Sequence, residues 1–436
     1  MYNPGLSDIL LTVMYVAILL WMLIHHQRLT EWRWGAGSYI LTSYIIYPIV
    51  GAFWFFAPYL LYGEIEELQL FPFLYLAAML YIATYPALKY DRLNITSIES
   101  PSMYIIYVFT IVYILCTLLQ IPDMVSHMDE GLTKIMVETE AGSDLYSETM
   151  ELNNDNTFTG SSFANIHIVI YNIFAQVACL LFFYYLTLEK KHYWAIIGLG
   201  CCIIIRCLTS IASGQRTEIT MTIFYIIVAY GATKSMMSVQ LKKIIRYALL
   251  SMGLIVAIPF LALTMSRFAE RDGGINGGLV YYIGEAPYYF NMNALDAGGT
   301  RQGDRTCNVF KKLLGMSSPD GEFGVRESYP HLKMSDAVFS TFVGDFILDF
   351  GVTITTLLFV IFSAIFSMSI RCNAPNQIPL HRLLLAYFAM CVCMRGGMYL
   401  FAFSFRGNLN IIAILLFYLT LVIDYHLRHK YAKQHK

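Results

Sequence analysis

The sequence predicts an all-α polytopic membrane protein with about 11 transmembrane helices. Of the 436 residues, 57% are hydrophobic and 14% are charged, whereas a soluble protein carries about 25% charged residues. Apolar runs of about 20 residues, the length that crosses the hydrocarbon of a bilayer, recur along the whole chain. A soluble core could not bury this much apolar surface, so residues 1–436 are expected to form a single integral membrane domain.

The candidate spans follow one another in the order of the chain. They cover residues 6–24, 39–61, 68–88, 103–121, 164–188, 194–212, 218–233, 247–265, 349–370, 380–403 and 408–427. The run at 218–233 is short for a span. Residues 337–348 are also apolar, and we expect them to form a surface helix that leads into the ninth span.

The distribution of lysine and arginine predicts the orientation of the spans. One set of connections is basic and the alternate short connections are not, as in the acidic stretch GEIEEL at 63–68. Because basic connections stay in the cytoplasm, the N-terminus is expected outside and the C-terminus inside. Two long segments then lie outside: the acidic loop 122–163 and the large cationic loop that runs from 266 to 348. Long loops cross the membrane regardless of their charge.

Arginines near the outer ends of the spans predict a binding site. A guanidinium within hydrocarbon costs from about 2.5 to more than 10 kcal/mol, so it is found where it faces a partner or a cavity. The sequence has no Asp or Glu deep in a span to act as that partner. We therefore expect an electropositive cavity that binds a lipid diphosphate, since arginine recognises phosphate through paired hydrogen bonds. The candidate residues are Arg206, Arg216, Arg267, Arg271 and Arg395. Alternatively, single arginines at span ends anchor a helix by snorkelling.

The large loop carries candidates for proton transfer and sugar binding. The candidate bases are His331, Glu285, Asp345 and Asp349, because His and carboxylates relieve a hydroxyl of its proton. Aromatic rings suit a sugar, and the candidates are Tyr281, Tyr282, Tyr288 and Tyr289. Other interpretations remain open: Glu285 as a solvated loop carboxylate, and Asp345 and Asp349 as caps of the ninth span or partners of Arg216 or Arg267. Asp345 and Asp349 are four residues apart and share one helix face.

Four short motifs give the chain a family resemblance. They are SGQRTEI at 213–219, SRFAER at 266–271, EAPYYFN at 285–291 and GDFILDFG at 344–351. With these motifs, the chain from about residue 164 onward resembles the O-antigen polymerases, the Wzy-type oligosaccharide repeat-unit polymerases, a group that also includes the O-antigen ligases.

The resemblance implies a membrane-embedded, inverting glycosyltransferase of the bacterial inner membrane. A large periplasmic loop with short helices would cover its active site. Its donor would be a growing glycan on undecaprenyl diphosphate, its acceptor an incoming lipid-linked repeat unit, and its product an O-antigen or capsule. The resemblance implies no cofactor, metal or nucleic acid; membrane lipid and a chain-length regulator protein are candidate partners. Arg216 and Arg267 match diphosphate-contacting arginines of the family, and His331 occupies a place comparable to a functional histidine of the ligases.

Other functions remain as alternatives. An O-antigen ligase would have nearly the same fold and transfers finished glycan to another acceptor. A flippase or transporter of lipid-linked oligosaccharide would place its site near the midplane, often on broken helices. A purely structural membrane protein would leave the arginines within the spans unexplained.

Overall fold

The computed structural model describes most of the chain, and nearly all of it is helical. The described residues are 4–56, 66–122, 124–126, 166–212, 217–251, 253, 280–319, 321–334, 338–372, 376–400, 402 and 404–434. They divide into two compact units, and the single integral membrane domain stays a prediction. The first unit comprises Met1–Asn94, Arg271–Arg371 and Leu385–Ile412, and the second comprises Ile95–Glu270, Cys372–Leu384 and Ala413–Lys436.

Within the described residues, seven helices are long and apolar enough to cross a membrane. They are Leu6–Leu29, Ala36–Phe55, Leu70–Arg92, Tyr193–Ala212, Thr217–Met236, Thr341–Ser369 and Arg406–Tyr431. The number of candidate spans rises to eight if the bent pair of helices Ile166–Ile173 and Ala175–Thr187 forms one span. The prediction of an all-α multi-pass membrane protein is therefore confirmed, whereas the count of about 11 and the orientation stay predictions. The eighth predicted run, 247–265, lies mostly outside the described residues.

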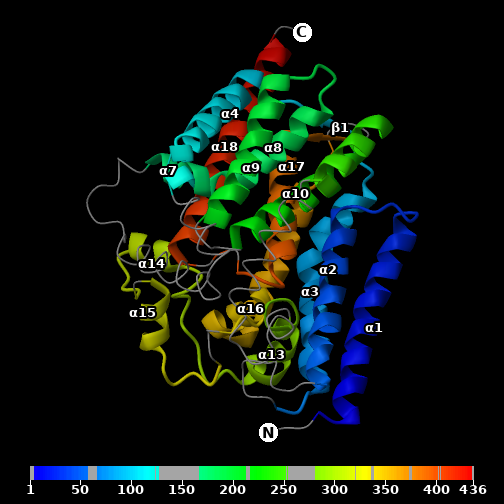
Figure 1. The fold of residues 1–436 in the computed structure, drawn as a ribbon, viewed down its shortest axis with the longest axis vertical. Coiled ribbons are helices and arrows are strands. Elements are labelled where there is room, and N and C mark those ends of the chain that lie inside the picture. Colours follow the sequence, from blue (N-terminus) through cyan, green and yellow to red (C-terminus); the bar gives the residue numbers. More distant parts are fainter. Residues whose placement is uncertain are drawn as a thin grey trace. The chain divides into compact units, whose positions relative to one another are not determined.

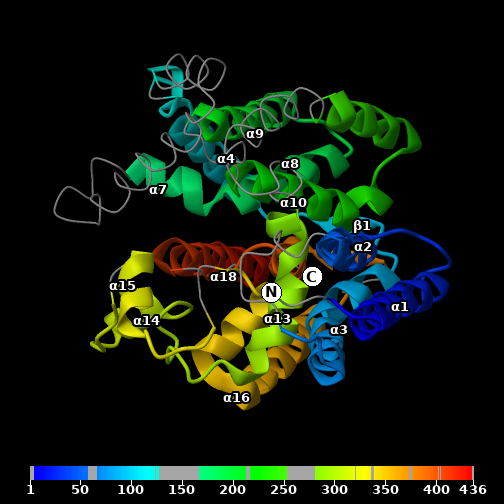
Figure 2. The same ribbon diagram turned by 60° about the horizontal axis from the view of Figure 1, so that its bottom comes forward.

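The first unit is built on four long helices. Helices α1 (Leu6–Leu29), α2 (Ala36–Gly51) and α3 (Leu70–Arg92) pack against one another, and α16 (Thr341–Ser369) packs along α3 (Figure 1). Shorter elements lie between α3 and α16 in the sequence or follow α2. They are η1 (Ala52–Phe55), η4 (Val280–Gly284), α13 (Glu285–Asn293), η5 (Ala294–Asp296), α14 (Asn308–Leu313) and α15 (Gly321–Ser328). Figure 2 shows α14 and α15 next to each other.

Two glycines bring the loop segment directly onto α2. A Cβ on Gly51 would lie 2.3 Å from the carbonyl oxygen of Gly284, and a Cβ on Gly284 would lie 2.2 Å from the amide nitrogen of Gly51. No side chain fits at either position, so the two backbones touch. This contact seats η4 and the start of α13 on the end of α2.

A break within α16 separates a short helix from the span. Gly351 has φ 78° and ψ 167°, a backbone conformation that only glycine adopts without strain. Residues 341–350 therefore form a helix of their own ahead of 352–369. A helix precedes the ninth span as expected, with its boundary at Gly351 rather than at 348, but most of its side chains are buried within the protein. Its position at the membrane surface stays a prediction.

The second unit contains the remaining helices. They are α4 (Met103–Leu118), α7 (Ile166–Ile173), α8 (Ala175–Thr187), α9 (Tyr193–Ala212), α10 (Thr217–Thr233) and η3 (Lys234–Met236). Helix α8 packs against α9 and α10, and α4 packs against α7 and α9. Two short strands, β1 (Ser97–Glu99) and β2 (Gln377–Pro379), pair in parallel. Helices α17 (Leu380–Arg395) and α18 (Ser404–Gln434) contribute residues to both units.

The contact between Gly51 and Gly284 yields a stability prediction. We expect Gly51→Ala and Gly284→Ala each to lower the thermal unfolding midpoint in detergent, because the added methyl group forces two backbones apart at a cost of about 1–3 kcal/mol or more. The matched control is Gly200→Ala in α9, whose Cβ would meet only Phe182 at 3.5 Å. Alanine favours a helix, so this variant should keep or raise the midpoint. Equal midpoints for all three variants would contradict the close contact.

Candidate functional site

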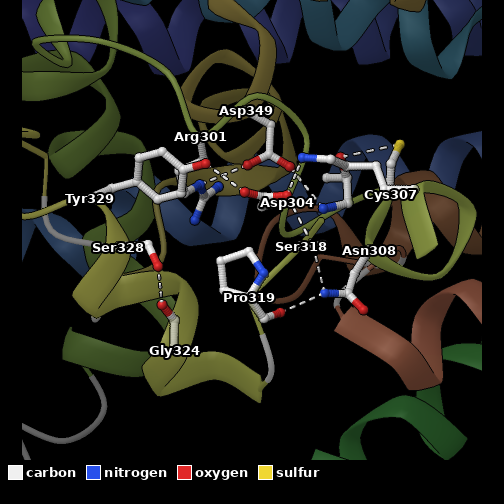
Figure 3. A network of polar contacts seen from close by, with 12 residues as sticks. Arg301, Asp304, Cys307, Asn308, Ser318, Pro319, Gly324, Ser328, Tyr329 and Asp349 are labelled. Atoms are coloured by element: carbon white, nitrogen blue, oxygen red, sulfur yellow. Dashed lines mark hydrogen bonds and ion pairs between the residues drawn. The ribbon is translucent and has the colours of Figure 1, made fainter. Parts of the chain in front are cut away.

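A buried ionic network fixes the large loop to α16 in the first unit (Figure 3). Arg301 is 1% exposed; its Nε lies 2.7 Å from Oδ1 of Asp349, and its Nη2 lies 3.5 Å from Oδ1 of Asp345. Nη2 also donates to the carbonyl oxygen of Asp345 at 3.2 Å. The second oxygen of Asp349 accepts the N–H of Thr306 at 2.8 Å. One guanidinium thus lies between two carboxylates of a single helix face.

The break at Gly351 explains why this loop binds at this place. In an unbroken helix, the carbonyls of Leu348 and Asp349 would accept N–H groups from the next turn. Here the N–H of Arg301 donates to Leu348 O at 2.8 Å, and the N–H of Gly303 donates to Asp349 O at 3.1 Å. The loop therefore supplies hydrogen-bond donors at the broken end of the helix, and this places the Arg301 side chain beside both carboxylates.

Asp304 is the second anchor of the loop. It forms an ion pair with Lys311, accepts the hydroxyl of Ser318 at 2.9 Å and accepts the phenol of Tyr329. Burial raises the pKa of Tyr329 to about 12, and the hydrogen bond to Asp304 and its charge add to the effect. Tyr329 therefore stays protonated and donates. The turns that carry α14 and α15 are joined through this one carboxylate (Figure 3).

This geometry shows which groups the carboxylates of Asp345 and Asp349 contact. Asp345 and Asp349 do share one face, and both are buried, with Asp349 at 0% exposure. Among the described residues their partner is Arg301; the alternative partners Arg216 and Arg267 lie outside the described residues. Each oxygen of Asp349 already faces a loop group. In this conformation Asp349 braces the loop and offers no oxygen to a substrate.

A small open hollow lies beside the network. It measures about 230 Å³ and is lined by residues 294–299 together with Ile347, Gly351 and Val352. Three of its glycines have positive φ: 80° at Gly298, 153° at Gly299 and 78° at Gly351. A Cβ on Gly299 would lie 3.3 Å from Nε2 of His331. His331 is exposed, so the structure brings this candidate base to the edge of the hollow.

The other candidate residues of the large loop differ in how far they are buried. Glu285 begins α13 and is 2% exposed, so the interpretation as a solvated carboxylate is wrong. Tyr288 is fully buried; its hydroxyl donates to Pro48 O at 2.7 Å and its ring packs against Trp54. Such a ring belongs to the core and presents no face to a sugar. Tyr289 is 5% exposed and Tyr282 is 42% exposed, while the side chain of Tyr281 lies outside the described part.

Arg206 is engaged within the second unit. Its guanidinium forms an ion pair with Glu218, donates to Tyr171 O at 3.3 Å, and lies 5.1 Å from the centroid of the Tyr171 ring. The expectation that no carboxylate would pair with it is wrong. Glu218 lies in the first turn of α10, and Arg206 is six residues before the end of α9, about 9 Å along the helix. A long arginine side chain covers that distance.

Of the four other candidate arginines, the structure describes only Arg395. Arg395 ends α17, is 6% exposed and lies 5.1 Å from the Tyr399 ring. The glycines after it admit neighbouring side chains: a Cβ on Gly397 would lie 2.0 Å from Tyr47. Arg216, Arg267 and Arg271 lie outside the described residues. The convergence of the arginines on one cavity stays a prediction.

Sequence reasoning missed Arg301 and Asp304 as organising residues. A signal was present: TRQGDRT at 300–306 places opposite charges three residues apart, directly after the glycine pair at 298–299. Within the described residues, no group of three His, Cys, Asp or Glu side chains could hold a metal ion.

Comparisons with protein-family models, with curated proteins and with solved structures find no match to this chain.

The Arg301 network yields a second stability prediction. We expect Arg301→Met to destabilise the protein by about 3–5 kcal/mol, because it leaves two carboxylates buried without their cation. Thermal unfolding in detergent measures the effect. Lys333→Met is the control: it removes the exposed pair with Asp296, whose side chains are 63% and 80% exposed, and should cost about 1 kcal/mol or less. Similar midpoints for the two variants would refute the organising role of Arg301.

Proposed function

We propose that this chain is a bacterial inner-membrane glycan polymerase. It joins undecaprenyl-diphosphate-linked oligosaccharide repeat units into surface polysaccharide, an O-antigen or a capsule. The observation that carries the proposal is the large loop: in a chain of membrane-spanning helices, residues 280–334 fold into short helices held by buried ion pairs, with His331 at an open hollow. Such a rigid layer suits an enzyme that works at one face of the membrane. The motif resemblance to the O-antigen polymerases supports the same conclusion.

The proposed reaction is an inverting glycosyl transfer. The hydroxyl at the non-reducing end of the acceptor repeat unit attacks the anomeric carbon of the donor glycan. The bond from that carbon to the diphosphate oxygen breaks, and undecaprenyl diphosphate leaves with the electron pair. Arg216, Arg267 and Arg271 stabilise the charge that develops on the leaving group, an effect of several kcal/mol in a water-poor site. His331 receives the hydroxyl proton as the general base.

In this proposal Arg206 acts through its neighbours. It is paired with Glu218 and bonded to Tyr171, and Glu218 follows Arg216 by two residues. We therefore assign Arg206 a positioning role at the start of α10. Arg395 keeps its assignment as a diphosphate ligand, since its guanidinium lies at the end of a buried helix near the GG pair.

A flippase of lipid-linked oligosaccharide is the second candidate, because two helices are broken. Helices α7 and α8 meet at a bend of 59°, and α16 is interrupted at Gly351. Broken helices mark substrate sites in many transporters. The O-antigen ligase also remains an alternative, since the motif resemblance covers both enzymes.

The arginines give the first functional prediction. Arg216→Ala and Arg267→Ala should each reduce polymerisation of purified lipid-linked repeat unit by about 100-fold or more, because each removes a cation from the leaving group. Gel analysis of the glycan products measures chain length. The control is Lys243→Ala, an exposed lysine on a connection predicted to be cytoplasmic, which should leave chain length unchanged.

A deletion strain separates the three candidate functions. Single repeat units on the surface lipid indicate a lost polymerase. Long polymer stranded on undecaprenyl diphosphate indicates a lost ligase. Repeat units that remain on the cytoplasmic leaflet indicate a lost flippase. Normal chain lengths in both arginine variants would overturn the assignment of the diphosphate site.

His331 gives the second functional prediction. His331→Gln should lower kcat by about 10²–10⁴-fold, because the general base is lost, while KM changes little. His25→Gln is the control, since His25 is an exposed histidine of α1, and it should retain wild-type kcat. Full activity of His331→Gln would remove this residue from the mechanism without touching the arginine assignment.

A further inference from the structure

Three large apolar side chains stand exposed outside the candidate spans. Leu313, Leu314 and Met316, called here the α14 tip, are 73%, 77% and 54% exposed. Leu313 is the last residue of α14, and Leu314 and Met316 follow it in the large loop, outside the helices that qualify as spans among the described residues. Adjacent apolar side chains seldom remain in water, because their burial is favoured. The α14 tip therefore calls for something that covers it.

The α14 tip is held rigidly in this exposed position. The N–H of Met316 donates to Lys311 O at 2.9 Å, and the N–H of Gly315 donates to Lys312 O at 3.0 Å. With Gly315 at φ 74°, these two bonds form a Schellman motif, a common ordered end of a helix. The exposure is thus a property of a defined turn and not of a frayed end.

The start of α14 is fastened to the end of a membrane span. Asn408 is 0% exposed; its Oδ1 accepts the N–H of Val309 at 3.1 Å, and its Nδ2 donates to Thr306 O at 2.8 Å. The span begins at Arg406, so Asn408 lies about 3 Å inside its end. Leu314 is five residues beyond Val309, about 7.5 Å along a helix. The α14 tip is therefore held within a short distance of the bilayer boundary.

The charges beside the α14 tip match a lipid surface. Lys311 and Lys312 come directly before Leu313 in α14. A lysine can extend its ammonium to the headgroup phosphates while its stem and the neighbouring leucines lie in the apolar layer. Lys311 is paired with Asp304, and the Lys312 side chain is exposed.

We infer that the α14 tip inserts into the interfacial layer of the leaflet at the Arg406 end of α18, the outer leaflet in the predicted orientation. The bilayer thereby covers Leu313, Leu314 and Met316. Because Asp304 joins α14 to Tyr329, this anchor also holds the braced part of the loop at a fixed height above the membrane. The inference does not depend on the proposed enzymatic activity.

Spin labelling in a bilayer tests the anchor. Leu314→Cys carries a nitroxide, and the protein is reconstituted into nanodiscs of phosphatidylethanolamine and phosphatidylglycerol. Power saturation then compares how often the nitroxide collides with oxygen, which concentrates in lipid, and how often it collides with a nickel chelate, which stays in water. The unsubstituted protein, treated in the same way, corrects for label on the native cysteines. Glu327→Cys on α15 is the matched exposed control.

The expected result is a label at 314 that is accessible to oxygen and shielded from nickel, with the opposite ratio at 327. A label at 314 that is as accessible to nickel as the one at 327 would place the tip in water and overturn the inference. A label shielded from both reagents would mean that protein, a second copy or a partner, covers the tip, and would overturn it as well. Leu313→Cys repeats the measurement at a second exposed position.

Discussion

A guanidinium taken out of water must be neutralised where it lies, and this constraint organises both units. Arg301 lies between Asp345 and Asp349 in the first unit. Arg206 is paired with Glu218 and bonded to Tyr171 in the second. In each case the arginine joins segments that hydrophobic packing alone would leave free to slide: the large loop on α16, and the start of α10 on α7 and α9. The charges therefore specify which segments meet.

An ion pair can determine which segments meet without adding to the stability of the protein. Desolvating two charges costs free energy that their attraction recovers only with good geometry and additional hydrogen bonds. Two backbone hydrogen bonds add to the ion pairs of Arg301: Thr306 donates to Asp349, and Arg301 itself donates to the carbonyl oxygen of Asp345. The break at Gly351 is part of the same arrangement, since it opens two helix carbonyls to the N–H groups of the loop. In an unbroken helix, these two carbonyl groups would be bonded within the helix and could not accept the N–H groups of the loop.

The sequence predicted what depends on local pattern and missed what depends on partners. Apolar runs identified the spans, because hydropathy over about 20 residues needs no knowledge of neighbours. A separate helix before the ninth span was expected because residues 337–348 are apolar, but the break at Gly351 was not. The pairing of Arg206 with Glu218 was not predicted, because Glu218 lies at a helix end and not deep within a span, and the two side chains together reach across that distance. Tyr288 could not be told from Tyr282 by sequence, since burial is decided by the contact of Gly284 with Gly51.

The pairing of the arginines also narrows where a diphosphate could bind. Arg206 and Arg301 were available on sequence grounds as loop or span cations, yet each has a carboxylate partner. Recruiting Arg206 to a ligand would break its ion pair with Glu218. Recruiting Arg301 would leave Asp345 and Asp349 buried without a cation, which costs several kcal/mol. In the proposed reaction, the diphosphate is therefore bound by other arginines. Arg216, Arg267 and Arg271 lie at span ends or in the loop, where a cation can reach a headgroup-level phosphate without first losing its hydration. We therefore propose that Arg206 and Arg301 position the helices and the loop, and that Arg216, Arg267 and Arg271, together with Arg395, bind the diphosphate.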